Sequence, residues 1–171
     1  SGGPLAFSSD GKRLALSLDR TVLCLETGTG KQLWRAKAGP PMCMTFAADD
    51  SMLALTQQGG PSGLMLILLD AVTGNPLERV KLPPVEGWCW DCMARGDTLA
   101  LLLPKRTLLW DLKRGKERTS LEGMGGSDGT CHRLALTPDG KSVFTLGCLL
   151  ERWDADSGKR QYADTRPLGH T

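Results

Sequence analysis

Short apolar runs alternate with polar turns along the whole chain. Leu14-Ala15-Leu16, Leu53-Ala54-Leu55 and Leu99-Ala100-Leu101 are typical runs, and each follows a turn rich in Asp, Gly or Lys. No segment shows the 3.6-residue periodicity of an amphipathic helix. Short strands separated by Asp-Gly and Thr-Gly turns are typical of antiparallel sheet, so the pattern predicts an all-β protein.

The turns themselves recur with a fixed spacing. Four aligned glycines, separated by 44, 41 and 43 residues, are Gly30, Gly74, Gly115 and Gly158. An acid precedes each glycine by four residues, namely Glu26, Asp70, Asp111 and Asp154. A second turn lies upstream in every unit, at Asp10-Gly11, Asp49-Asp50, Gly96-Asp97 and Asp139-Gly140. The chain is therefore an array of four repeats.

Each repeat divides into four strands. The first strands end at Phe7, Phe46, Met93 and Leu136, and the second contain Ala15, Ala54, Ala100 and Phe144. The third end at Leu25, Leu69, Trp110 and Trp153, and the fourth cover 31–36, 75–80, 116–121 and 159–163. Fourth strands mix polar and apolar residues, as the exposed edge of a sheet does. We expect four four-stranded antiparallel repeats at about 1–38, 39–82, 83–126 and 127–171, in one segment.

Several of these residues resemble the WD-repeat β-propeller family. The resemblance rests on segments 5–12 and 134–141, the dipeptides Trp110-Asp111 and Trp153-Asp154, and Gly169-His170. A four-stranded unit of this length is one blade of such a propeller. The resemblance, to a degenerate and bacterial-style form of the repeat, implies a noncatalytic module for protein–protein interaction or scaffolding within a larger protein or assembly.

The chain departs from the family's hydrogen-bonded tetrad of His, Ser or Thr, Trp and Asp. The first repeat has Ser17 and Asp19 but Leu25 in place of Trp. The last has Thr145 and Trp153 without an Asp in the turn that follows the second strand. We therefore expect leucine packing to replace that network.

Family propellers usually have about seven or eight blades, so four blades make about half a ring. Three arrangements remain: two copies of the chain completing an eight-bladed ring as a homodimer, further blades missing from this chain, or a small closed four-bladed propeller. The first two leave terminal blades with apolar faces that must be covered.

Charge and composition exclude other classes of protein. Lysine and arginine total 21 against 19 acids, a net charge of +2 that is spread along the chain, which disfavours nucleic-acid binding. The longest apolar run, 64–69, is too short to cross a membrane. Six cysteines and no export signal in 1–4 favour reduced thiols and a cytoplasmic location.

Candidate chemistry is sparse. Cys89 and Cys92 form a Cys-x-x-Cys on the expected first strand of the third repeat, where residues three apart point to opposite faces and do not share a metal. His132 and His170 have no nucleophile motif nearby. We expect no catalytic residues, cofactor or metal. The alternative is a quinoprotein-type propeller enzyme fragment, because Glu26-x-x-Thr29-Gly30-Lys31-x-x-Trp34 is similar to the motif by which those enzymes lock neighbouring blades.

The expected binding surface is the loop face, formed by the turns between second and third strands and by the links between blades. Trp88 is the best anchor, because exposed aromatic residues beside charged neighbours are typical of binding hot spots. The protein-binding candidates on this face are Trp88, Arg20, Asp19, Gln57, Gln58, Glu86, Lys105 and Arg106. The partner is a protein of unknown identity.

Overall fold

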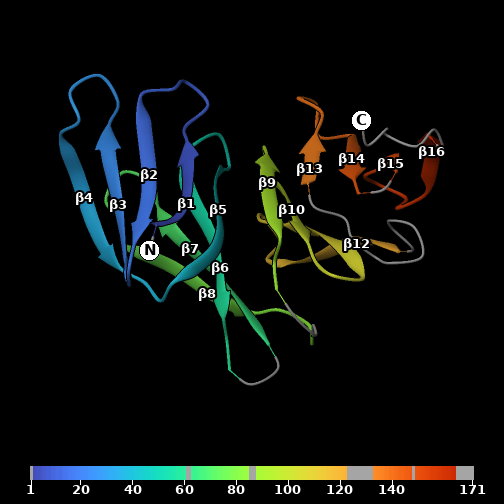
Figure 1. Ribbon diagram of the computed structural model, residues 1–171, viewed down its shortest axis with the longest axis horizontal. Helices are drawn as coiled ribbons and strands as arrows, with labels where there is room; N and C mark the ends of the chain where they lie inside the picture. Colours follow the sequence, from blue (N-terminus) through green and yellow to red (C-terminus); the bar gives the residue numbers. More distant parts are fainter. Residues whose placement is uncertain (1, 61–62, 85–87, 123–132, 148, 165–171) are drawn as a thin grey trace, which may run out of the picture. The chain divides into compact units, whose positions relative to one another are not determined.

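The computed structural model describes residues 2–60, 63–84, 88–122, 133–147 and 149–164. These residues form sixteen β-strands and no helix (Figure 1). The strands make four antiparallel sheets of four strands each, in two compact units, Ser1–Trp88 and Cys89–Thr171. The expected all-β fold with four four-stranded repeats is confirmed.

The first unit holds two sheets, which we call blades one and two. Blade one contains β1 (Gly2–Phe7), β2 (Arg13–Leu18), β3 (Thr21–Glu26) and β4 (Gln32–Lys37). Blade two contains β5 (Pro41–Ala47), β6 (Met52–Gln58), β7 (Leu64–Asp70) and β8 (Pro76–Lys81). In both, every strand pairs with the next along the chain, so the fourth strand lies at the edge as the polarity predicted.

The second unit repeats this plan in blades three and four. Blade three contains β9 (Asp91–Arg95), β10 (Thr98–Leu102), β11 (Arg106–Asp111) and β12 (Lys116–Glu122). Blade four contains β13 (Arg133–Leu136), β14 (Ser142–Leu146), β15 (Leu150–Asp154) and β16 (Arg160–Asp164). The first strands of paired blades are neighbours, β1 with β5 and β9 with β13, as in a propeller.

Each unit has its own apolar core between its two blades. In the first unit Ala15 and Cys24 of blade one pack in a cluster with Phe46 and Leu53 of blade two. In the second unit Leu109 of blade three packs in a cluster with Val143 and Trp153 of blade four. The alternation of residues along each strand therefore sets which face enters the core.

Asp side chains hold the repeated turns in the same way. Asp10 Oδ1 accepts hydrogen bonds from Ser8 Oγ (2.7 Å) and the Lys12 backbone (2.9 Å). Asp70 Oδ1 accepts from the backbone N–H of Thr73 (2.7 Å) and from its hydroxyl (2.8 Å). Asp139 and Asp154 repeat the two arrangements in blade four. These acids are structural, because their oxygens are engaged by the turn itself.

Blade four corrects the expectation that leucine packing replaces the polar network. Trp153 Nε1 donates to Thr145 Oγ1 (3.0 Å), and that hydroxyl donates to Glu151 Oε2 (3.5 Å). Glu151 is only 1% exposed, and its other oxygen receives Arg160 Nη1 at 2.8 Å. An acid on the third strand therefore replaces the turn Asp that blade four lacks.

The Cys-x-x-Cys motif also differs from the expectation. Cys89 lies before β9 and only Cys92 lies on it, so the argument from opposite strand faces does not apply. Both side chains are buried. Among the residues that the structure describes, no cluster of His, Cys, Asp and Glu is suited to hold a metal ion.

Candidate functional site

A basic groove lies on the loop face of the first unit. Its volume is about 580 Å³. The described residues that line it are Arg20, Thr21, Lys37, Ala38, Gly39, Pro40, Gln57 and Arg79. They come from the β2–β3 turn, the link between blades one and two, the end of β6, and β8. The groove thus draws on both blades of one unit, and we call it the basic groove.

The turn between β2 and β3 presents Arg20. Leu18 pairs with Thr21 across this turn, which leaves Asp19 and Arg20 as its two central residues. Asp19 has φ +54°, a left-handed conformation that Asp adopts more readily than most residues. Arg20 is exposed, and it lines the groove beside Thr21.

Close packing at the link between the blades fixes Gln57 in the groove wall. A Cβ added to Gly39 would lie 2.6 Å from Gln57 Oε1, so glycine is the residue that this approach permits. Gln57 Oε1 is buried and has no hydrogen-bond partner among the described residues. This oxygen packs against Gly39 and is not exposed to a ligand in the groove.

The electrostatics of the basic groove favour an anion. Arg20, Lys37 and Arg79 are all exposed cations, and no carboxylate is among the described lining residues. Guanidinium groups bind carboxylates through two parallel hydrogen bonds. The groove can therefore hold a carboxylate or another anion.

The structure brings some of the predicted site residues together. Arg20 and Gln57 line the groove, and Asp19 precedes Arg20 in the same turn. Gln58 is exposed and donates through Nε2 to the Gly60 carbonyl (3.1 Å). Trp88 is 64% exposed but does not line the groove.

The remaining predicted site residues lie elsewhere. Lys105 and Arg106 belong to the second unit, where Arg106 forms an ion pair with Glu117 at 3.8 Å. Glu86 lies outside the described residues. Trp88, Lys105 and Arg106 therefore do not contribute to the basic groove.

Sequence reasoning missed Lys37 and Arg79. Both lie on fourth strands, for which the sequence pattern predicts only a sheet edge. A signal was present, because Lys37 ends β4 directly before the Ala38-Gly39-Pro40 link. A basic residue at the end of an edge strand that enters an interblade link is a candidate for the loop face.

Trp34 has the blade-locking contact that the quinoprotein-type motif implies. Its Nε1 donates to the Ala71 carbonyl of blade two at 3.0 Å, and the side chain is 7% exposed. Its ring lies against Gly74, where a Cβ would approach Trp34 Cε3 to 2.5 Å. This contact is structural and brings no reactive group into the groove.

Comparison with known proteins gives no family. No family model matches the chain, and no curated protein matches it. No described segment forms a helix long and apolar enough to span a membrane. The resemblance to WD-repeat propellers remains a prediction from the sequence.

Proposed function

We propose that this protein is a noncatalytic propeller module that binds an acidic segment of a protein partner at the basic groove, as part of a larger protein or assembly. The observation that carries the proposal is the set of Arg20, Lys37 and Arg79 around one groove, with no carboxylate among the lining residues that the structure describes. Loop faces that join rigid blades are common binding surfaces. The proposal agrees with the protein-interaction function that the WD-repeat resemblance implies.

One feature favours a peptide over a free small anion. The groove volume of about 580 Å³ exceeds what a single phosphate or carboxylate fills. We propose that several acidic side chains of one peptide contact the three cations.

The test measures fluorescence anisotropy of a labelled hexaglutamate peptide, with hexalysine and single-stranded DNA hexamers as competing probes. Hexaglutamate is expected to bind, and its affinity is expected to fall with added salt, because exposed charges are screened. The Arg20→Ala/Arg79→Ala variant is expected to weaken binding by about tenfold, from about 1 kcal/mol or less for each exposed ion pair.

Lys31→Ala is the matched control, since Lys31 is an exposed cation of the β3–β4 turn that does not line the groove. It is expected to change the affinity by less than about twofold. Equal losses in both variants would indicate nonspecific attraction, and tighter binding of the DNA would favour a nucleic-acid ligand. Either result contradicts the proposal.

The quinoprotein-like enzyme is the second candidate, and the Trp34–Ala71 contact is the observation that favours it. That candidate predicts ultraviolet-visible absorbance of a bound quinone cofactor after reconstitution. It also predicts an increase in Tm on addition of calcium. The binding module predicts neither change.

A further inference from the structure

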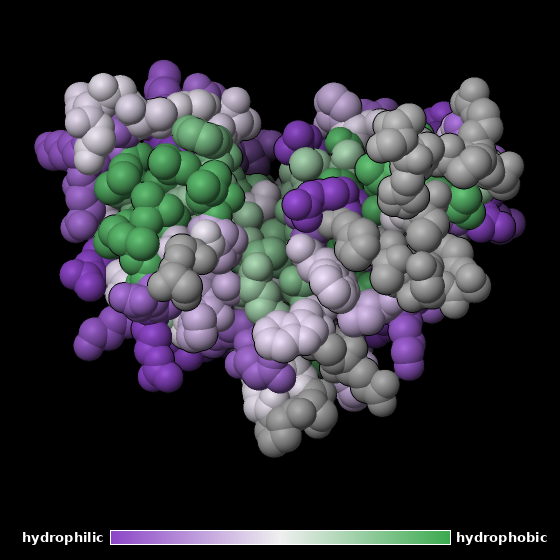
Figure 2. All heavy atoms as spheres, in the orientation of Figure 1, coloured by the Kyte–Doolittle hydropathy of each residue, from purple (hydrophilic) through white to green (hydrophobic). Residues whose placement is uncertain are grey.

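One face of blade one is apolar and uncovered. Leu5 is 63% exposed and Phe7 is 55% exposed. Leu14, Leu16, Leu23 and Leu25 lie on the same face and are half-buried. Figure 2 shows the hydrophobic patch over this sheet. We call it the free face of blade one, and a patch of this kind marks an interaction site.

The strand registers show what this face corresponds to in the other blades. In blade one Leu5 pairs with Leu16 and Phe7 with Leu14. In blade two Met44 pairs with Leu55 and Phe46 with Leu53. The six equivalent positions of blade two are Met44, Phe46, Leu53, Leu55, Ile67 and Leu69, and all of them are buried in the core shared with blade one. The free face therefore has the positions by which blade two docks on the blade before it.

Blade four gives the same result. The equivalent positions are Leu134, Leu136, Val143, Thr145, Glu151 and Trp153. None of them is more than 6% exposed, and the four apolar ones pack in the core shared with blade three. In both units this face covers a preceding blade, so the occupant that fits the free face of blade one is another blade.

Two side chains of blade one donate hydrogen bonds across the contact between blades one and two, which we call the seam. Trp34 Nε1 and Arg13 Nη1 both donate to the Ala71 carbonyl, at 3.0 and 2.9 Å. Arg13 also lies over the Phe46 ring, 5.2 Å from its centroid. An aromatic residue and a guanidinium of one blade thus engage a turn and a Phe of the next.

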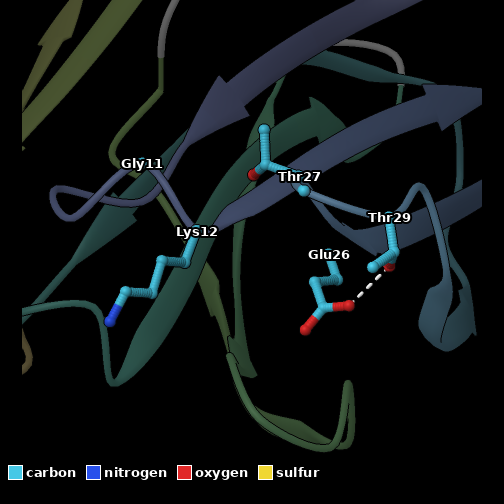
Figure 3. A pocket seen from close by; sticks show the side chains of 6 residues that line it. Gly11, Lys12, Glu26, Thr27 and Thr29 are labelled. Atoms are coloured by element: carbon cyan, nitrogen blue, oxygen red, sulfur yellow. Dashed lines mark hydrogen bonds between the residues drawn. The ribbon is translucent and has the colours of Figure 1, made fainter.

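Blade one has the same turn, and no side chain of the described residues donates a hydrogen bond to its Thr27 carbonyl. The Thr27 backbone donates to the Lys12 carbonyl (2.9 Å), as Ala71 donates to Ser51 (3.0 Å). A pocket of about 550 Å³ lies against this turn, where Figure 3 shows the Glu26–Thr29 hydrogen bond. The described lining residues are Gly11, Lys12, Glu26, Thr27, Gly28 and Thr29. We call this pocket the socket.

Blade four carries the two side chains that fit the socket. Tyr162 pairs with Arg152 across β15 and β16, as Trp34 pairs with Cys24 in blade one. Tyr162 is 45% exposed. Arg152 Nη2 donates to Ser142 Oγ (3.1 Å), and Ser142 occupies the register position that Arg13 has in blade one. An aromatic ring and a guanidinium are therefore available on this face of blade four.

We propose that blade four of a second copy of this chain docks on the free face of blade one. Tyr162 then takes the place of Trp34 against the Thr27–Gly30 turn, and Arg152 takes the place of Arg13. Phe7 lies at the register position of Phe46, so the Arg152 guanidinium meets an aromatic ring as Arg13 does. The Glu26 carboxylate in the socket supplies an opposite charge. The contact is head-to-tail and uses different surfaces on the two copies.

The test measures molar mass by light scattering on three variants of the full chain, separately and mixed. Wild type is expected to have at least twice the mass of 18.4 kDa. Phe7→Asp places a charge in the free face of blade one. Arg152→Glu/Tyr162→Ser replaces the two side chains of blade four that are proposed to dock on that face. Each variant alone is expected to be a monomer, and an equal mixture of the two is expected to form a dimer through its one intact seam.

Val72→Asp is the matched control, because Val72 is 71% exposed in a turn of blade two that takes no part in the proposed contact between copies, and this variant is expected to keep the wild-type mass. Circular dichroism verifies that each variant retains its β-structure. A monomeric wild type overturns the proposal. So does a dimer that persists in the Arg152→Glu/Tyr162→Ser variant, because that result indicates two blade-one faces stacked on each other.

Discussion

Two tryptophans at the same register position have different surroundings. Val143 pairs with Trp153 in blade four, and Leu99 pairs with Trp110 in blade three. The hydroxyl that receives the indole in blade four belongs to Thr145, and its counterpart in blade three is Leu101. Trp110 Nε1 is accordingly buried without a hydrogen-bond partner among the described residues. One Thr-to-Leu difference decides whether the indole is satisfied.

The Trp153–Thr145–Glu151 network is expected to stabilise blade four. Thr145→Val keeps the shape of the side chain but leaves a buried indole N–H and a buried carboxylate without their shared hydroxyl. The variant is expected to lower the free energy of unfolding by about 1–3 kcal/mol. Urea unfolding followed by tryptophan fluorescence measures the change.

Thr56→Val is the matched control for Thr145→Val. Thr56 is also fully buried on a second strand, but its hydroxyl contacts the Cys43 thiol at 3.1 Å, and thiols make weak hydrogen bonds. The expected loss is less than about 1 kcal/mol. A loss as large as that of Thr145→Val would show that the network in blade four contributes nothing of its own.

At the scale of elements, the acid-containing turns make stability depend on pH. The Thr73 hydroxyl and backbone hold the pKa of Asp70 below its ordinary value of 3.8, and Ser157 lowers the pKa of Asp154 in the same way. The Lys12 backbone and Ser8 lower the pKa of Asp10, while Thr137 and the Lys141 backbone lower that of Asp139. In all four cases hydrogen bonds to the carboxylate favour its charged form.

A lowered pKa in the folded state means that these turns stabilise the fold above pH 3.8 and lose that contribution as the pH falls further. The free energy of unfolding is therefore expected to decrease between pH 5 and pH 3, as measured by urea denaturation at each pH. Asp70→Asn/Asp154→Asn is expected to flatten this decrease, since the amide does not titrate. An unchanged slope in that variant would contradict the assignment.

Two turn glycines differ in the space available for a Cβ atom. Gly74 and Gly11 both have positive φ, +74° and +69°. A Cβ on Gly74 would meet the Trp34 ring, whereas a Cβ on Gly11 would meet nothing within 4 Å. Gly11→Ala is expected to cost about 1–2 kcal/mol from backbone conformation alone.

Gly74→Ala is expected to cost at least about 1 kcal/mol more than Gly11→Ala, because it also displaces the interblade tryptophan. Urea unfolding of the two variants gives the difference directly. Equal decreases in the free energy of unfolding would mean that the first unit accommodates the added methyl group at Gly74 without weakening the contact between its blades. Gly158 has the same role in the second unit, where a Cβ would lie 2.9 Å from Thr119 Oγ1.

For the molecule as a whole, the repeat spacing and the alternation of apolar residues were enough to predict sixteen strands in four meanders. Each strand pairs with its neighbour in sequence, so local pattern determines the topology. The groove was only half predictable. Arg20 lies in a turn and Gln57 at the end of β6, next to the loops where binding residues are expected, but Lys37 and Arg79 become neighbours of the groove only through the packing of two blades. The role of Glu151 likewise depends on its register opposite Thr145.

The basic groove and the free face of blade one share no described lining residue. Peptide binding and association with a second copy are therefore expected to be independent. Phe7→Asp is expected to leave the affinity for hexaglutamate within about twofold of wild type, as measured by anisotropy, while changing the molar mass. A larger effect would indicate coupling between the two surfaces.

The hydrogen bonds that Trp34 and Arg13 donate to the Ala71 carbonyl affect which substitutions these turns can accept. The acceptor is a main-chain carbonyl, which every amino acid supplies. These hydrogen bonds therefore do not constrain the type of residue at position 71. Thr27 and Ala155 occupy the counterpart positions and make the same backbone hydrogen bond to the neighbouring turn. The exposed side chains of these turns can therefore change while the blades keep this contact, whereas Ala71 and Ala155 are held small by the cores that bury them. A library that randomises the exposed position 72 should retain folded members of many residue types, whereas libraries at Ala71, which is fully buried, or at Gly74 should retain few.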